Sequence, residues 1–143
     1  MMDADNQKKD IASHLQTGIL GERVAADYLQ SKGYTIVKRN YRFLKYEIDI
    51  IAKKDQYIVF VEVKTRTEFK GTQYGRPSRA VDLEKRKNLV KAAKSFINYL
   101  NIKGMFYRFD VIEVYINTEP ITNEKNFKVN HMLGVFGAGG RLI

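Results

Sequence analysis

Two β-prone segments in the middle of the chain carry the side chains best suited to chemistry. The segments Glu47–Ala52 and Tyr57–Lys64 flank a short polar turn, a pattern that predicts a β-hairpin. If the hairpin pairs in register, Asp49 on the first strand lies beside Glu62 on the second. Two neighbouring carboxylates repel unless a proton or a cation lies between them. The pair therefore indicates a divalent metal site, with Lys64 next to it.

Strand geometry predicts how these side chains are presented. Residues two apart on a strand point to the same face, so Glu62 and Lys64 follow Ile58 and Phe60 on one side. Valines occupy the other side of the same strand, namely Val59, Val61 and Val63. A strand that is apolar on both faces is typical of the centre of a sheet covered by helices. On the partner strand, Asp49 is expected to face away from both of its isoleucine neighbours, Ile48 and Ile50.

The remaining pattern predicts one α/β domain over residues 11–132. Its expected elements are a helix over 11–31 ending before Gly33, an edge strand over 34–43, the hairpin, a loop over 65–79, a helix over 80–100, a strand over 105–116 and a short strand over 127–132. Residues 1–10 are expected to form a flexible N-terminus, and residues 133–143 a flexible glycine-rich tail.

Composition narrows the class of protein. The chain has 143 residues, 44% of them hydrophobic, and no cysteine. Absence of cysteine excludes disulfides and cysteine-bound zinc, and it fits a reducing cytoplasm. No secretory signal is visible in the first ten residues, and no apolar run approaches the roughly 18 residues of a membrane span. The net charge of +9 favours a polyanionic partner, with nucleic acid before a membrane surface.

The positive charge is concentrated after the hairpin. Between Arg66 and Lys103, ten Lys or Arg stand against three Asp or Glu, a difference of +7. Cations on the predicted loop and helix are expected to hold phosphates: Arg66, Lys70, Arg76, Arg79, Lys85, Lys87, Lys91 and Lys94. The alternative is a solvated helix face and a basic surface loop.

Two further carboxylates are candidates for the same site. Glu22 falls on or beside the apolar stripe of the first predicted helix, near Gly18 and Gly21, where glycine indicates close packing against the backbone. Its alternative role is an ion pair at the edge of the stripe. Asp110 resembles another inward carboxylate, with an alternative role of holding Arg108. The two histidines, His14 and His131, are expected to be surface or packing residues.

These motifs together resemble the YraN-like family, which is similar to the PD-(D/E)xK nucleases and to archaeal Holliday junction resolvases. The resemblance covers roughly residues 15–116 and rests on Gly21-Glu22, Gly33-Tyr34, Arg39-Asn40, Glu47-Ile48-Asp49, Val61-Glu62-Val63-Lys64, the Lys85 region and Arg108-Phe109-Asp110. Tyr46 departs from the family pattern, which has glycine at this position. The implied fold is restriction-endonuclease-like, a mixed β-sheet flanked by helices with an αβββαβ core.

The resemblance implies a function and roles for the site residues. Asp49, Glu62 and the Val63 carbonyl would supply hard oxygen ligands to Mg²⁺ or Mn²⁺. Glu22 would bind a second metal or orient a water, and Lys64 would stabilise the attacking hydroxide. The predicted activity is Mg²⁺-dependent endonuclease cleavage of DNA, with branched or single-stranded DNA of recombination and repair as candidate substrates.

Three alternatives remain open from the sequence. The charged residues of the hairpin can be strand-end carboxylates with Lys64 paired to one of them. A protein of the same fold can bind nucleic acid without cutting it, or its basic face can bind an acidic protein. Resolvases act as symmetric dimers, so a homodimer is implied, although the sequence identifies no dimer surface.

Overall fold

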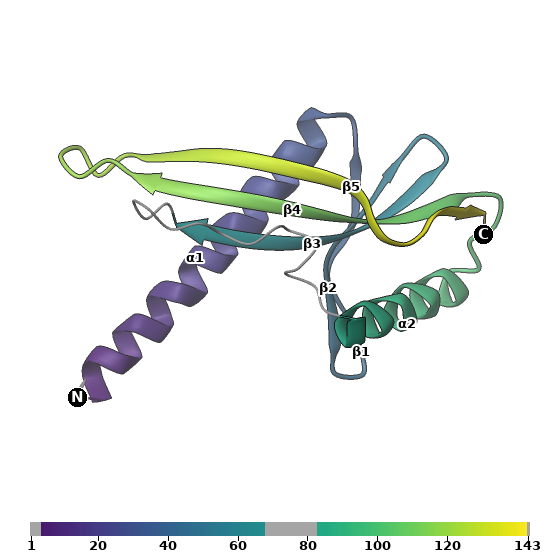
Figure 1. The fold of residues 1–143 in the computed structure, drawn as a ribbon, viewed down its shortest axis with the longest axis horizontal. Coiled ribbons are helices and arrows are strands. Elements are labelled where there is room, and N and C mark those ends of the chain that lie inside the picture. The colour runs from purple at the N-terminus through teal and green to yellow at the C-terminus, as the bar shows by residue number, and fades with distance from the viewer. Residues whose placement is uncertain (1–3, 68–82, 143) are drawn as a thin grey trace.

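A single mixed β-sheet carries both helices of the described chain (Figure 1). The computed structural model describes residues 4–67 and 83–142. Its elements are α1 (Ala4–Ser31), β1 (Thr35–Phe43), β2 (Tyr46–Lys54), β3 (Tyr57–Thr67), α2 (Leu83–Tyr99), β4 (Phe106–Thr118) and β5 (Lys125–Leu142). The sheet order is β1-β2-β3-β4-β5, with β3 and β4 parallel and the other neighbours antiparallel. The predicted mixed sheet flanked by helices is therefore confirmed.

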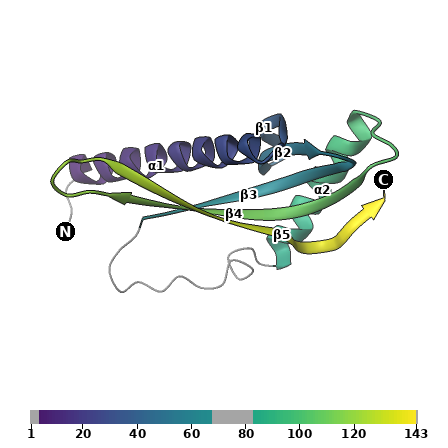
Figure 2. The ribbon, with the colours of Figure 1, turned by 90° about the horizontal axis from the view of Figure 1, so that it is seen from above.

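Strand β3 is central, as its two apolar faces predicted. Val59 and Val61 pack with Ala25 and Leu29 of α1. On the opposite face, Phe60 packs with α2, where Phe96 lies edge-on to its ring. The two helices therefore cover opposite faces of the sheet, and Figure 2 shows α1 running along one side of the strands. Glu62 and Lys64 follow Phe60 at two-residue spacing, so they are expected on the face of β3 that α2 covers.

The N-terminal helix is longer than the sequence indicated. A flexible end was expected through residue 10, but α1 begins at Ala4. The first residues of α1 include Ala, Gln and Lys, which have good helix propensity, and no proline interrupts them. The predicted stop at Gly33 is confirmed, because Gly33 has a φ of 91° and Tyr34 N donates back to Leu29 O.

The glycine-rich C-terminal segment also differs from the prediction. Residues 133–143 were expected to be a flexible tail, whereas β5 continues to Leu142 along β4. The ladder changes register twice between Tyr107 and Val111, and Gly134 adopts a φ of 62°. Glycine tolerates this positive φ, so Gly134 allows the bulge at which β5 changes register and continues along β4. Within the described residues, no helix is both long and apolar enough to cross a membrane.

Strand β2 does not alternate regularly around Asp49. The isoleucines on either side of Asp49 were expected to face the same way, but Ile48 packs with the α2 cluster and Ile50 with the α1 cluster. Opposite this point on β1, Asn40 has a φ of 52°. The β2–β3 pairing extends only to Ile50 opposite Val61. The two strands therefore separate at Asp49, where the chain is free to twist.

Helix α1 lies very close to the sheet at Gly21. A Cβ placed on Gly21 would overlap Thr65 Oγ1 and lie 2.8 Å from Thr65 Cβ. We therefore expect Gly21→Ala to destabilise the fold by about 1–3 kcal/mol through overpacking. Chemical denaturation measures the change, and the double variant Gly21→Ala/Thr65→Ala should recover part of it.

Gly18 offers a matched control one turn earlier on the same helix. A Cβ there would meet no atom within 4 Å among the described residues. Gly18→Ala should raise the free energy of unfolding by up to about 1 kcal/mol, because alanine is the better helix former. Equal effects of the two substitutions would contradict the close approach at Gly21.

Candidate functional site

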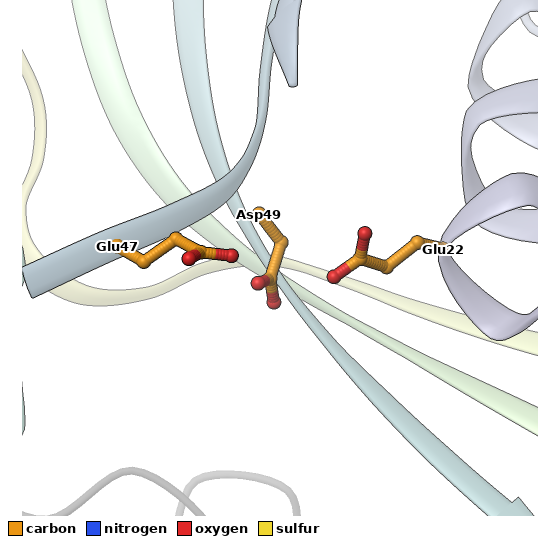
Figure 3. Close-up of side chains that lie close together, drawn as sticks. All are labelled: Glu22, Glu47 and Asp49. Atoms are coloured by element: carbon orange, nitrogen blue, oxygen red, sulfur yellow. The ribbon is translucent and has the colours of Figure 1, made fainter. Parts of the chain in front are cut away.

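Three carboxylates from two elements converge where β2 and β3 separate. Glu22 comes from α1, and Glu47 and Asp49 come from β2; one oxygen from each lies within 4.8 Å of the others. Figure 3 shows the side chains of Glu22 and Glu47 pointing toward Asp49 from opposite sides. We call this group the acidic cluster. The sequence predicted two of its members, and Glu47 was quoted only as part of a motif.

Asn40 on β1 connects two members of the acidic cluster. With its amide nitrogen facing the carboxylates, Asn40 donates to Glu47 Oε1 at 3.2 Å and to Glu22 Oε2 at 3.1 Å. Its positive φ belongs to the left-handed region, which asparagine tolerates better than other non-glycine residues. Asn40 therefore helps to position the two glutamates, a role that its residue type alone did not reveal.

Asp49 is the most strongly perturbed member of the cluster. Its Oδ2 accepts a hydrogen bond from Val63 N at 2.8 Å, which links β2 to β3 beyond the last paired residues. Burial raises the pKa of Asp49 to about 8, with the charges of Glu62 and Glu22 adding to the shift and the Val63 hydrogen bond opposing it. The ionised carboxylate is thus costly without a neighbouring cation.

Glu22 lies in a similar but less extreme environment. Burial raises the pKa of Glu22; Arg39, at 4.0 Å, opposes this shift, and the charge of Glu47 increases it. On the far side of the cluster, Arg42 Nε lies 3.1 Å from Glu47 Oε2. The two arginines partly offset the negative charge at its edges, while Asp49 lies between the two glutamates.

Glu62 lies beside the acidic cluster and is held by two lysines. Lys85 Nζ donates to Glu62 Oε1 at 2.5 Å, and Lys64 Nζ lies 3.4 Å from the same oxygen. Burial lowers the pKa of Lys64, with the Glu62 charge opposing this shift and the Lys85 charge adding to it. The predicted neighbours Asp49, Glu62 and Lys64 are therefore brought together, with Lys85 as an additional cation.

The donor set of the acidic cluster fits a hard divalent cation. All its side-chain ligands are carboxylate oxygens, the type that Mg²⁺ and Mn²⁺ prefer. Burial raises the pKa of both Asp49 and Glu22, so a cation would remove an electrostatic cost already present in the fold. Glu22, Glu47 and Asp49 would hold such an ion, with Glu62 adjacent. The Val63 carbonyl, which the resemblance implies as a further ligand, stays a prediction; the N–H of the same residue donates to Asp49.

A cleft opens beside the cluster, between the start of β2 and the start of α2. Its volume is about 390 Å³. We call it the β2–α2 cleft, and its lining comprises Lys45, Tyr46, Glu47, Asp49, Glu62, Glu84, Lys85, Asn88 and Leu89. Two members of the acidic cluster therefore form part of its wall, and a molecule in the cleft would lie against the candidate metal ligands.

The expected phosphate-binding cations are in several different settings. Arg66 Nε lies 3.8 Å from Glu113 Oε2, a buried carboxylate that the sequence analysis did not select. On α2, an exposed row is formed by Lys87, Lys91 and Lys94, as predicted from helical spacing. Three predicted cations lie outside the described residues: Lys70, Arg76 and Arg79.

Asp110 belongs to a separate buried network. It is fully buried and accepts hydrogen bonds from Arg108 Nε at 3.0 Å and from Gly134 N at 3.0 Å. His131 Nε2 lies 2.7 Å from Asp110 Oδ2, and Arg108 Nη2 donates to Tyr34 OH at 2.6 Å. This supports the alternative in which Asp110 holds Arg108. His131, expected to be a surface or packing residue, instead places a buried side chain in the same polar network.

Removal of Asp110 should therefore affect folding. We expect Asp110→Ala to lower the free energy of unfolding by about 3 kcal/mol, because the largely enclosed Arg108 and His131 would both lose their buried partner. Urea denaturation measures this loss. Exposed Asp27→Ala is the control and should change stability by less than about 0.5 kcal/mol.

Together these features describe a mixed α/β protein with an acidic cluster and two lysines at the point where two central strands separate. The chain belongs to a family described as uncharacterised protein family UPF0102, whose model matches residues 21–114. This confirms the resemblance to the YraN-like family. A UPF0102 protein of Caldanaerobacter subterraneus subsp. tengcongensis is 48% identical over 83% of this chain and 93% of its own length.

Other relatives carry the same description. A UPF0102 protein of Chlorobium phaeobacteroides is 42% identical over 85% of this chain and 93% of its own. One from Clostridium botulinum is 49% identical over 71% of this chain and 80% of its own. These names give no activity, so function has to be argued from the site.

Proposed function

We propose that this protein is a divalent-metal-dependent endonuclease that hydrolyses DNA phosphodiester bonds. The observation that carries the proposal is the convergence of Glu22, Glu47 and Asp49, with one oxygen from each within 4.8 Å of the others. Beside them, Lys64 lies 3.4 Å from Glu62. Acidic oxygen ligands next to a half-buried lysine suit phosphoryl chemistry. The element order α1-β1-β2-β3-α2-β4 supports the αβββαβ core of the restriction-endonuclease-like fold that the resemblance implies.

Each residue has a physical role in this proposal. When bound, Mg²⁺ or Mn²⁺ would neutralise charge on the scissile phosphate and lower the pKa of a water. The acidic cluster would hold this cation, with Asn40 orienting Glu22 and Glu47. Lys64 donates to the phosphate or to the attacking oxygen, and Lys85 keeps Glu62 in place. The exposed α2 lysines attract the DNA backbone.

A cleavage panel tests the proposal directly. Purified protein is incubated with single-stranded, duplex, flap and four-way DNA, in Mg²⁺ or Mn²⁺ and in excess chelator. At least one DNA form should be cut, and the chelator should stop the reaction. If no form is cut with either metal, the catalytic proposal is wrong.

The exposed lysine row on α2 would also serve a second candidate, a non-catalytic nucleic-acid-binding protein of the same fold. Such a protein should bind nucleic acid with strong salt dependence and without any need for metal. Calorimetric titration with Mn²⁺ separates the two candidates. Only the endonuclease has to bind Mn²⁺ through the acidic cluster, so only it has to give a heat of binding that is lost when the cluster is mutated. For the proposed endonuclease we expect a cytoplasmic location, DNA as the partner and a homodimer.

A further inference from the structure

We propose that the β2–α2 cleft binds one unstacked nucleotide of a single strand, with Tyr46 as the stacking surface. This inference rests on the proposed function and names its substrate class, a DNA strand with an unpaired nucleotide at the cut position. It is drawn from the side chains that line the cleft, beyond those that hold the cation.

The cleft has the size and chemical mixture of a small-ligand site. Its volume of about 390 Å³ falls in the range of roughly 300–1,000 Å³ found for such sites. Its lining includes Tyr46 from β2 and, from α2, Asn88 and Leu89. A nucleobase has two apolar faces and a polar edge, so it needs both an aromatic surface and an amide.

Tyr46 is held in place by its surroundings. It opens β2 and pairs across the turn with Phe43, and it packs against the α2 cluster. Lys45 Nζ lies 5.7 Å from the centroid of its ring. A half-buried ring fixed on a strand stacks a base at lower entropic cost than a mobile one. Such stacking tolerates any base, because every base has a π face.

The charges of the cleft decide which part of the nucleotide lies where. Glu47, Asp49 and Glu62 would repel a phosphate, unless a cation in the acidic cluster bridges them to it. Lys45 and Lys85 also line the cleft, and Lys85 is paired with Glu62. The phosphate therefore lies at the acidic cluster, and the attached base points toward Tyr46 and Asn88.

This arrangement excludes a base that remains stacked in a duplex. A paired base shows only its groove edges, and its faces are covered by its neighbours, so it cannot stack on Tyr46. Single strands and branch points supply unstacked bases without the cost of flipping a paired one. The cleft should therefore select DNA with an unpaired nucleotide, independently of sequence.

Fluorescence of 2-aminopurine tests the proposal without any cleavage. A single-stranded oligonucleotide with one 2-aminopurine and a matched duplex are titrated with full-length protein in Ca²⁺ at constant salt. Wild-type protein should bind the single strand more tightly and change the 2-aminopurine emission. Tyr46→Ala should weaken single-strand binding about 10-fold, a size expected for loss of one stacked base, and should abolish the emission change. Duplex binding should change less than 2-fold.

Two further variants keep the result interpretable. Tyr46→Phe retains the ring and should bind like wild type, and Asn88→Ala should weaken single-strand binding while leaving the stacking signal. Circular dichroism checks that each variant is folded. If folded Tyr46→Ala and wild type have the same ratio of single-strand to duplex affinity, the inference is overturned, whether or not the protein cuts DNA. A Tyr46 effect on binding in a protein that cuts nothing upholds the inference and rejects only the endonuclease.

Discussion

Asp49→Asn is expected to stabilise the metal-free protein while it abolishes metal binding and cleavage. Burial and the charges of Glu62 and Glu22 raise the pKa of Asp49 to about 8. In the unfolded chain the same group titrates near its ordinary value of 3.8. At neutral pH the fold therefore has to bind a proton or bear an ionised carboxylate in an unfavourable site. Asparagine removes this cost and can still accept the Val63 hydrogen bond through its Oδ1.

The sign of the pH dependence follows from proton linkage. Because the folded pKa is the higher one, the native state binds more protons than the unfolded state between about pH 4 and pH 8. The free energy of unfolding of the wild type should therefore fall as pH rises through this window. At 1.36 kcal/mol per unit the upper limit is about 6 kcal/mol; water in the open cleft reduces this to roughly 2–3 kcal/mol. Asp49→Asn should lack this slope.

Thermal denaturation at pH 5 and pH 8.5, with and without Mn²⁺, measures both effects. In metal-free buffer at pH 8.5 the Asp49→Asn variant should melt above wild type, whereas at pH 5 the two should be closer. Mn²⁺ should raise the melting temperature of wild type only, since binding to the native state adds stability by mass action. Exposed Asp27→Asn is the control and should follow wild type throughout. A variant less stable than wild type at pH 8.5 would mean that the Asp49 charge supports the fold.

The sequence predicted the central strand and its charged end because strand alternation is a local property. Val59 and Val61 share one face, Phe60 lies on the other, and the structure places them as expected. Glu47 could have been found by the same rule, since residues two apart share a face and Glu47 precedes Asp49 by two. The side-chain alternation of β2 is interrupted between Ile48 and Ile50. This interruption depends on the neighbouring strand, so the sequence alone did not show on which face Glu47 and Asp49 lie.

Other features depend on tertiary geometry that no local pattern encodes. Glu22 reaches the cluster because α1 crosses the sheet at the Gly21–Thr65 contact, and this crossing is set by packing between distant segments. Asn40 acts through a positive φ, which its residue type permits without requiring. Lys85 was expected to bind phosphate, but it also neutralises Glu62. A helix face predicts exposure of a lysine and does not identify its partner.

Lys64→Met is expected to separate catalysis from binding. Methionine keeps most of the apolar stem and removes the ammonium group that lies 3.4 Å from Glu62 Oε1. The acidic cluster would remain intact, and Lys85 would still hold Glu62, so Mn²⁺ affinity should change less than about 2-fold. Loss of one positioned donor to the reacting phosphate should lower kcat by about 10²–10³-fold. Steady-state cleavage at saturating DNA measures kcat, and calorimetry measures the affinity for Mn²⁺.

Lys87→Met on the exposed face of α2 is the matched control for Lys64→Met. It removes the same charge from an exposed residue that is not among the described residues lining the β2–α2 cleft, so it should weaken DNA binding and its salt dependence slightly while leaving kcat unchanged. A fall in kcat at Lys64 alone identifies an interaction made in the transition state, because uniform binding would alter KM instead. If both variants lost kcat equally, Lys64 would have no special role in catalysis. The acidic cluster would then have to act without a hydrogen-bond donor from Lys64.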